Sequence, residues 1–217
     1  MTKLVVFDCD GTLVDSQAAI VRSMDIAFAA AGLAPPDRNA VRRIVGLSLP
    51  QALIELAPDA SADQHRHALE SYKASFRAAR SEGTLEQPLY PGMKELLERL
   101  HAGGRTLGVA TGMSDRGLVA CLVRHGVREL FSTLQTADRH PSKPDPAMLE
   151  AALFEAGVSP GAAVMVGDTV FDVTMARTAG VRAIGVAWGY HEPEELIAAG
   201  AVAVAWSAEE LEELIHG

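Results

Sequence analysis

Hydrophobic positions fall into short apolar runs that alternate with amphipathic segments. The apolar runs predict buried strands at residues 4–7, 106–110, 163–166 and 183–187, with a weaker candidate at 201–205. Helical periodicity covers residues 92–102, 114–125, 146–156, 171–179, 193–198 and 208–215. This alternation of strand and helix predicts an α/β fold with a Rossmann-like, mainly parallel sheet and helices on both of its faces.

The alternation is interrupted after the first predicted strand. Residues 20–31, 39–45, 49–56 and 62–79 have helical patterns, and no convincing strand lies among them. Prolines at positions 35, 36, 58 and 88 mark the breaks. We therefore expect an inserted helical cap domain at residues 16–87, with the α/β core formed by residues 1–15 and 88–217.

The composition limits the classes of protein to which this chain can belong. The chain has 217 residues, of which 48% are hydrophobic and 22% charged, as expected for a folded globule. Its net charge of -9 argues against nucleic acid or an anionic membrane as the main partner. The first apolar run is too short for a signal peptide, and no run approaches membrane-spanning length. We expect a cytoplasmic protein that is a monomer or a weak homodimer.

Two carboxylates follow the first predicted strand, in the sequence Asp8-Cys9-Asp10-Gly11. Residues two apart on an extended segment point to the same side. One carboxylate could attack a substrate while the other carries a proton, and Gly11 would let the backbone approach a ligand. The alternative is an ordinary acidic turn, because Asp and Gly are common turn residues.

Two further segments offer groups that suit an anion. Thr111 follows the second predicted strand and could donate a hydrogen bond to a phosphoryl oxygen, while Gly112 would leave backbone N–H groups accessible. Lys143, next to Pro144, could neutralise both a phosphate and a charged nucleophile. The alternatives are a simple strand-to-helix turn and an exposed lysine ahead of a helix that begins near Pro146.

Asp168 and Asp172 follow the third core strand and lie four residues apart. Carboxylate oxygens are the ligands that Mg²⁺ prefers in proteins. In the alternative, Asp168 caps a helix and Asp172 complements the positive end of the helix dipole. Because ligands bind beyond the carboxyl ends of parallel strands, we expect all four segments to meet at one edge of the sheet.

With these four motifs, the chain resembles the haloacid dehalogenase superfamily of phosphotransferases. The resemblance spans nearly the whole chain and includes the cap module that the superfamily carries after its first motif. The longer motifs Val14-Asp15-Ser16, Lys143-Pro144-Asp145-Pro146 and Met175-Ala176-Arg177-Thr178-Ala179-Gly180-Val181 resemble those of the phosphoglycolate-phosphatase-like branch.

The resemblance implies a role for each acid. Asp8 would attack phosphorus and form an aspartyl-phosphate, and Asp10 would protonate the leaving alcohol and then activate water. Mg²⁺ would bind the carboxylates of Asp8 and Asp168 and the backbone carbonyl of Asp10, with Asp172 in support through water. The implied enzyme is a Mg²⁺-dependent phosphoric monoester hydrolase, and phosphoglycolate is the first candidate substrate.

The same resemblance implies that Thr111 and Lys143 hold the transferred phosphoryl group. The cap would decide which small phosphate ester is bound. Candidate substrate contacts are Gly11, Gly112, Arg42, Arg43, Gly46 and Ser48. The alternative for the two arginines is a solvated helix face. Trp188 could line the entrance, although local packing is the simpler explanation.

Asp10 separates related branches of the superfamily. Dehalogenases lack an acid at this position and phosphonatases have alanine there, so both activities are disfavoured. A β-phosphoglucomutase-like mutase keeps both acids but carries arginine after a cap Gly-x-Ser, where this chain has Leu49. Because Arg42 and Arg43 could compensate, the mutase stays as an alternative, as does a non-catalytic phosphate-binding protein.

Overall fold

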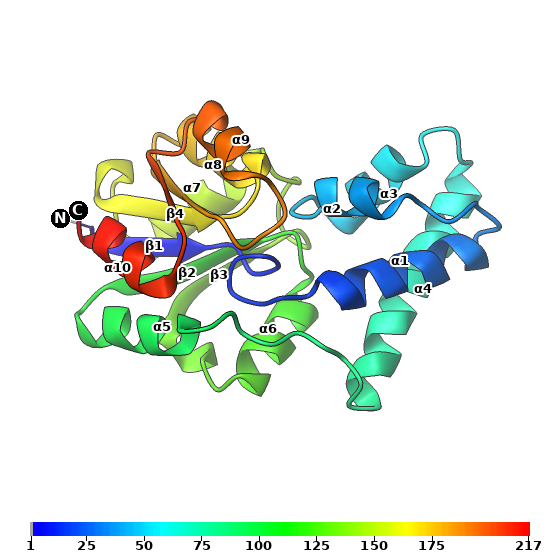
Figure 1. Cartoon of the computed structure of the whole chain (residues 1–217), viewed down its shortest axis with the longest axis horizontal. Coiled ribbons are helices and arrows are strands. Elements are labelled where there is room, and N and C mark those ends of the chain that lie inside the picture. Colours follow the sequence, from blue (N-terminus) through cyan, green and yellow to red (C-terminus); the bar gives the residue numbers. More distant parts are fainter. Residues whose placement is uncertain (1) are drawn as a thin grey trace.

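Six parallel strands form one sheet in the computed structural model, which describes residues 2–217 (Figure 1). Their order across the sheet is β3-β2-β1-β4-β5-β6, so the chain winds outward in both directions from the central β1. The strands are β1 (Leu4–Phe7), β2 (Thr106–Thr111), β3 (Phe131–Thr136), β4 (Ala163–Gly167), β5 (Arg182–Val186) and β6 (Ala203–Ala205).

The register aligns the carboxyl ends of the central strands. Phe7, the last residue of β1, pairs with Val109 of β2 on one side and with Val166 of β4 on the other. The segments after β1, β2 and β4 therefore leave the sheet at the same edge. These segments carry the acids and the threonine that the sequence singles out.

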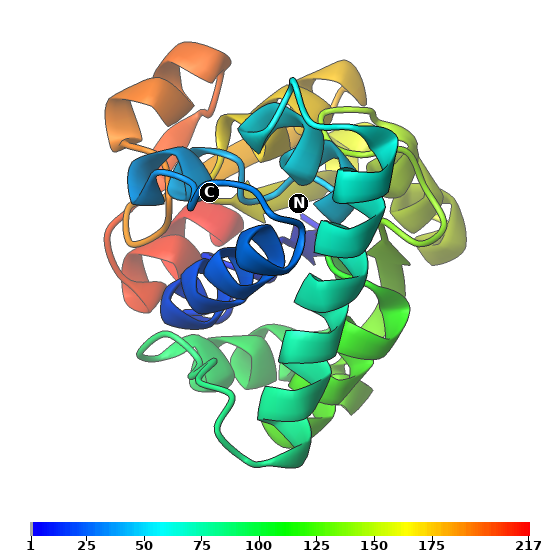
Figure 2. The same ribbon diagram turned by 90° about the vertical axis from the view of Figure 1, so that its right-hand side faces the viewer.

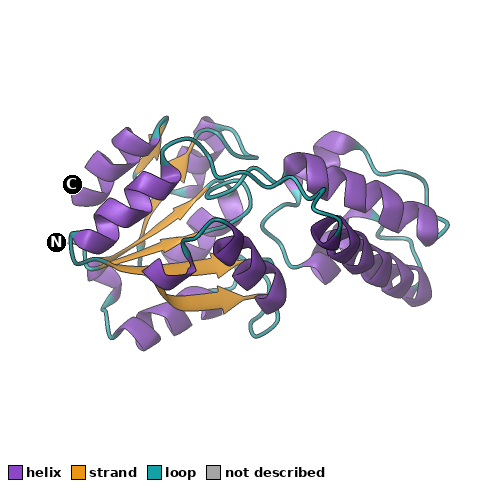
Figure 3. Ribbon diagram, turned by 90° about the horizontal axis from the view of Figure 1, so that it is seen from below, coloured by secondary structure: helices purple, strands orange, loops and turns teal. Residues whose placement is uncertain are grey.

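Helices cover both faces of the sheet (Figure 3). One face packs on α5 (Met93–Ala102), α6 (Asp115–Arg124) and α10 (Ala208–His216), and the other on α7 (Ala147–Ala156), α8 (Val170–Thr178) and α9 (Pro193–Ala199). Two 3₁₀ turns, Arg128–Leu130 and Pro160–Ala162, precede β3 and β4. Because both faces are buried, β1 and β4 consist of consecutive apolar residues without polar alternation.

Four helices lie beyond the carboxyl edge of the sheet: α1 (Gln17–Ala30), α2 (Arg38–Arg43), α3 (Leu49–Leu56) and α4 (Ala62–Ser81). They share a separate apolar cluster that includes Met24, Phe28, Leu53 and Ala68. Figure 2 looks onto this group and shows α1 and α4 lying across the front of the core. The expected fold class, a Rossmann-like core with an inserted helical cap, is confirmed.

The two connections between core and cap lie side by side. The backbone N–H of Asp15 donates to the carbonyl of Pro88 at 2.8 Å, and Val14 forms an antiparallel bridge with Leu89. The chain thus enters and leaves the cap through adjacent segments. Such an arrangement lets a cap move as one body with few backbone changes.

Two details of the predicted sheet are corrected by the structure. No strand was expected at β3, which forms one edge of the sheet, and β6 begins at Ala203 instead of Ala201. Strand β3 is polar for a strand: Ser132 is exposed, and the polar residues Thr133, Gln135 and Thr136 are buried. Within residues 2–217, no helix is both long enough and apolar enough to cross a membrane.

Candidate active site

Asp8 continues directly from β1 and is buried. Its backbone N–H donates to the carbonyl of Val166 at 2.9 Å, which extends the pairing of β1 with β4 by one residue. Oδ1 of Asp8 accepts hydrogen bonds from the backbone N–H of Cys9 at 2.6 Å and from Lys143 at 2.9 Å. Oδ2 is buried but has no partner among the described residues. A buried carboxylate oxygen without a partner retains the capacity to accept a hydrogen bond or to bind a cation.

Asp10 lies in the turn that follows. The N–H groups of Leu13 and Val14 both donate to the carbonyl of Cys9, and Gly11 adopts a φ of 89°, which suits glycine. Asp10 Oδ1 is also buried without a partner among the described residues. Asp8 and Asp10 line the same cavity between core and cap. The structure therefore brings the two acids together as the sequence predicts.

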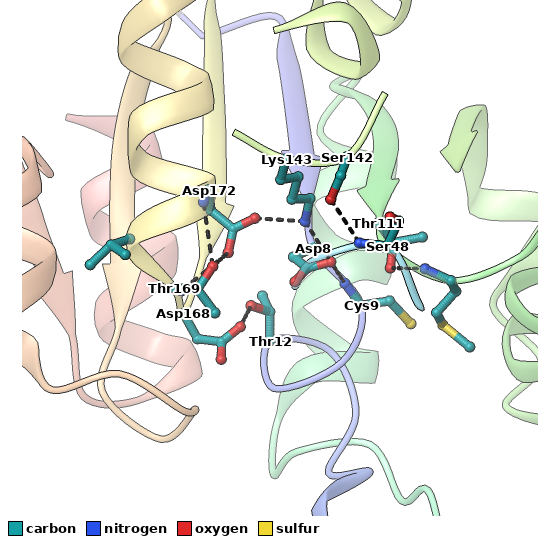
Figure 4. Close-up of polar contacts among 12 residues, drawn as sticks. Asp8, Cys9, Thr12, Ser48, Thr111, Ser142, Lys143, Asp168, Thr169 and Asp172 are labelled. Atoms are coloured by element: carbon teal, nitrogen blue, oxygen red, sulfur yellow. Dashed lines mark hydrogen bonds and ion pairs between the residues drawn. The ribbon is translucent and has the colours of Figure 1, made fainter. Parts of the chain in front are cut away.

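Lys143 lies between two carboxylates (Figure 4). Its ammonium nitrogen is 2.9 Å from Oδ1 of Asp8 and 2.6 Å from Oδ1 of Asp172, and its side chain has no exposed surface. The structure thus excludes the alternative of an exposed surface lysine. This cation holds Oδ1 of Asp8 in place, while Oδ2 remains free to contact a ligand.

Asp168 is enclosed at the end of β4. Thr12 Oγ donates to its Oδ1 at 2.7 Å, and the backbone N–H of Tyr190 donates to its Oδ2 at 2.9 Å. A Cβ atom at Gly11 or at Gly189 would overlap this carboxylate. Gly11 therefore serves the site in a way that the sequence did not show: it makes room for Asp168.

Asp172 has two structural partners. Thr169, rather than Asp168, caps α8, and its backbone N–H and hydroxyl donate to Oδ2 of Asp172 at 3.1 and 2.7 Å. The other oxygen accepts from Lys143. Asp172 therefore stabilises the start of α8 and also belongs to the charged cluster around Lys143.

One oxygen from each of Asp8, Asp168 and Asp172 lies within 4.8 Å of the others. All three side chains are buried, and Lys143 supplies one positive charge to the group. Three carboxylates need more positive charge than one lysine provides, and carboxylate oxygens suit a hard divalent cation. The cluster therefore fits a metal ion. The side chain of Asp10 is not part of it.

Burial has the largest effect on the pKa values of these acids. It raises the pKa of Asp8 to about 7 against the opposing effect of Lys143, and it also raises the pKa of Asp10 and of Asp168. Burial alone would lower the pKa of Lys143, but Asp172 and Asp8 outweigh it, so the net shift is upward. The lysine consequently keeps its charge, while the carboxylates would be stabilised in the ionised form by a further cation.

Thr111 ends β2 and lines the same cavity. Its Oγ accepts a hydrogen bond from the backbone N–H of Met113 at 3.3 Å, so its own proton remains free to be donated. Gly112 follows it, and a Cβ atom there would overlap the backbone carbonyl of Leu47 in the cap. The absent side chain lets the cap approach the core at this point.

The loop between α2 and α3 touches the core beside the cluster. The backbone N–H of Ser48 donates to Oγ of Ser142 at 2.8 Å (Figure 4). Gly46 has a φ of 100° and lines the cavity, and a Cβ atom there would lie 3.1 Å from Oγ of Thr169. Of these two predicted substrate residues, Gly46 faces the cavity and Ser48 binds the core through its backbone.

The two cap arginines lie elsewhere in this arrangement of the cap. Arg43 forms an ion pair with Glu195 of the core at 2.6 Å, and Arg42 donates to Oε1 of Gln17 at 3.2 Å. Neither is among the described residues that line the cavity. Trp188 donates its indole N–H to the carbonyl of Thr12 at 3.1 Å, which fits the packing role.

Sequence reasoning missed the wall that the cap contributes. The cavity has a volume of about 360 Å³, and its far side is lined by residues of α4 that include Tyr72, Lys73, Phe76 and Arg77. The spacing of Tyr72 and Phe76 places them on one face of a helix. That signal is present in the sequence, but it does not show which way α4 faces.

Comparison with known proteins agrees with this geometry. A family model described as haloacid dehalogenase-like hydrolase matches residues 5–186. Probable phosphatase IndB of Dickeya dadantii is 38% identical, with 92% of this chain and 87% of the relative covered. A phosphoglycolate phosphatase of Agrobacterium fabrum is 33% identical, with 88% of this chain and 82% of the relative covered.

Solved structures lead to the same family. A predicted phosphatase from Clostridium acetobutylicum superposes with a TM-score of 0.89 at 27% identity, covering 100% of this chain and 99% of its own. The expectation of an enzyme of the hydrolase class is thereby confirmed. The chain belongs to the haloacid dehalogenase-like hydrolase family.

Proposed function

We propose that the protein is a Mg²⁺-dependent phosphatase that hydrolyses a small phosphomonoester through an aspartyl-phosphate at Asp8. One observation carries the proposal. Asp8 and Asp10 line the cavity with Thr111, and each has a buried oxygen without a partner among residues 2–217, while Lys143 binds the other oxygen of Asp8. Family membership and relatives named phosphatase support the same reaction class.

In the first step, Oδ2 of Asp8 attacks phosphorus and the ester P–O bond breaks. The Cys9 N–H and Lys143 hold Oδ1, so the carboxylate presents its free oxygen in a fixed direction. Thr111 donates its hydroxyl proton to an oxygen of the phosphoryl group. The positive charge of Lys143 lowers the repulsion between the nucleophile and the substrate dianion.

Asp10 moves the proton in both steps. Burial raises the pKa of Asp10, which favours the protonated form that a general acid needs. It gives its proton to the departing alcohol. The resulting carboxylate then takes a proton from the water that attacks the aspartyl-phosphate, which regenerates Asp8 and releases inorganic phosphate.

The carboxylates of Asp8 and Asp168 would hold Mg²⁺ together with the backbone carbonyl of Asp10, and Asp172 would support the site. When bound, the ion supplies positive charge that offsets the repulsion between the phosphoryl group and the buried carboxylates. The partly neutralised cluster of Asp8, Asp168 and Asp172 is the observation that favours this assignment.

Phosphoglycolate is the first ester to test, because several relatives carry that substrate in their names. For a mutase, the chain lacks the arginine that would grip a second phosphate at position 49. Leu49 lines the cavity instead. We accordingly favour release of phosphate to water over transfer to a second sugar hydroxyl, in a cytoplasmic enzyme whose partner is a small phosphate ester.

The test is phosphate release from a panel of small phosphomonoesters, with EDTA, with EDTA followed by excess Mg²⁺, and with Asp8→Asn. We expect turnover that EDTA abolishes, that Mg²⁺ restores and that Asp8→Asn lacks. Turnover that survives EDTA would overturn the metal requirement, and full activity in Asp8→Asn would overturn the nucleophile. Isomerisation of a hexose phosphate that requires a bisphosphate primer would favour the mutase.

A further inference from the structure

The cap supplies the cavity with a largely apolar wall. Helices α1, α3 and α4 all contribute to it, through Ile20, Met24, Leu49, Pro50, Tyr72 and Phe76. At about 360 Å³, the cavity lies within the range that holds a drug-sized ligand. Phosphoglycolate, whose carboxylate is one carbon away from the ester oxygen, would leave this wall without a partner.

Tyr72 and Phe76 form an aromatic pair on this wall. Their ring centroids lie 4.9 Å apart with an angle of 29° between the planes, and they are one helical turn apart on α4. Both side chains line the cavity and are half-buried. A flat or cyclic apolar group entering the cavity would therefore meet an extended aromatic surface.

Cations accompany the aromatic pair. Lys73, Arg77 and Arg80 of α4 and Arg116 at the start of α6 line the cavity. Among the described residues, none of these four has an ion-pair partner, whereas Arg43, Arg66, Arg99 and Arg139 each lie against a carboxylate. One acid outside the catalytic pair, Asp138, also lines the cavity, and its Oδ2 accepts from the N–H of Asp115.

Together, these features suggest a substrate with three parts. Asp8, Asp10 and Thr111 form the proposed phosphoryl site, the aromatic pair lies on the cap wall, and the exposed Lys73 and Arg77 each follow one ring of that pair along α4. Lys73 and Arg77, which have no ion-pair partner among the described residues, attract anions.

We propose that the preferred substrate is a phosphomonoester whose alcohol contains an apolar ring and, beyond the ring, a second anionic group. The ring packs against Tyr72 and Phe76, and the anion binds Lys73 and Arg77. This inference rests on the proposed phosphatase function and refines it, because it assigns the leaving group while the phosphoryl site stays as described.

Two matched esters test it: 4-(carboxymethyl)phenyl phosphate and 4-(carbamoylmethyl)phenyl phosphate. They share the ring and the ester, and the methylene group insulates the leaving oxygen from the distal acid or amide. We expect kcat/KM to be about tenfold higher for the acid, mainly through KM. The preference should shrink as salt is added, because exposed charge pairs are screened.

Variants then locate the preference. Arg77→Gln and Lys73→Gln should each reduce the preference for the acid by lowering its kcat/KM much more than that of the amide. Phe76→Ala should lower kcat/KM for both esters. Arg66→Gln is the matched control, since it removes the same charge from α4 at a residue that pairs with Asp63 outside the cavity. It should leave both values unchanged.

Three results would overturn the inference while the phosphatase stands: equal kcat/KM for the two esters in the wild type, an equal loss for both esters in Arg77→Gln, or hydrolysis of small aliphatic esters with neither aryl ester accepted. An equal loss would show that the cations only steer phosphate. If no phosphomonoester of any kind is hydrolysed in the presence of Mg²⁺, the proposed function itself fails, and this inference fails with it.

Discussion

The ammonium nitrogen of Lys143 lies 2.9 Å from Oδ1 of Asp8, and both side chains are buried. The same ammonium is 2.6 Å from Asp172, so one cation joins the end of β1 to the start of α8. A buried charge is tolerated only when it is paired, so Lys143 and its two carboxylates depend on one another. This relationship links the stability of the core to the proposed nucleophile, Asp8.

Removing Lys143 should therefore harm stability as well as activity. We expect Lys143→Met to lower the free energy of unfolding by about 3–5 kcal/mol, because it leaves two buried carboxylates without their cation. Urea unfolding at neutral pH in EDTA measures the change. The exposed Lys94→Met should change stability by less than about 0.5 kcal/mol. A similarly small effect at Lys143 would contradict the pairing.

The two proposed roles of Asp10 predict a specific kinetic pattern. Asp10→Asn should lower turnover of an alkyl phosphate by roughly 10²–10⁴-fold, because the alcohol then leaves without its proton. With p-nitrophenyl phosphate, whose leaving group needs little protonation, the variant should release a burst of nitrophenol and then stall. Asp59→Asn, on an exposed cap loop, is the control. Equal losses on both esters, with no burst, would count against the role.

The close approach of Leu47 to Gly112 predicts that cap closure depends on a missing side chain. A Cβ atom in Gly112→Ala would overlap a backbone carbonyl, which cannot swing aside as a side chain can. We expect kcat/KM to fall roughly ten- to hundredfold through misplacement of the cap, with little change in melting temperature. Gly161→Ala, where a Cβ meets open space, should be neutral. Unchanged kinetics in Gly112→Ala would refute this reading.

His191 hydrogen-bonds to both the core and the cap, and it can make both contacts only as the neutral imidazole. Its Nδ1 accepts from the backbone N–H of Val170 at 3.2 Å, so Nε2 carries the proton and donates to the carbonyl of Arg43 at 3.2 Å. Burial lowers the pKa of His191; the charge of Arg43 also lowers it, while Glu195 and Asp172 act in the opposite direction. Protonation would place a second N–H against that of Val170.

The stabilisation from neutral His191 is therefore present above the unfolded-state pKa of about 6.5 and is lost as pH falls through the lower folded-state pKa. Between about pH 6.5 and pH 5, the wild type should lose up to about 1.4 kcal/mol per pH unit more than His191→Gln. Urea unfolding at several pH values measures the difference. Parallel pH profiles would show that His191 does not contribute.

The sequence predicts the strands that are buried on both faces and misses β3, one of the two edge strands. Strands β1 and β4 are continuous apolar runs because helices cover both of their faces. In β3, buried polar side chains are satisfied locally: Gln135 donates to Thr133, and Thr133 donates to Glu155 of α7. Such contacts replace hydrophobic periodicity, so a pattern of apolar residues cannot reveal that strand.

The candidate site also has one part that the sequence identifies and another that it does not. Asp8, Asp10 and Thr111 were identifiable because each closely follows or ends a predicted strand, where the fold places ligands. The contacts made by Arg43, and the way α4 turns Tyr72 and Arg77 toward the cavity, depend on how the cap docks. No local spacing encodes that docking, so the residues that the core contributes to the cavity could be predicted and those that α4 contributes could not.

The most direct test of the account is to trap the phosphorylated enzyme. Rapid acid quenching during turnover, followed by peptide mass spectrometry, should find one phosphoryl group on the peptide that contains Asp8. Reduction with borohydride should convert that residue to homoserine, which distinguishes it from Asp10. Asp8→Asn should show neither change. Phosphorylation of a different residue would contradict the central claim. So would turnover without any phosphorylated peptide in Asp10→Asn, where slow hydrolysis of the aspartyl-phosphate should let this intermediate accumulate.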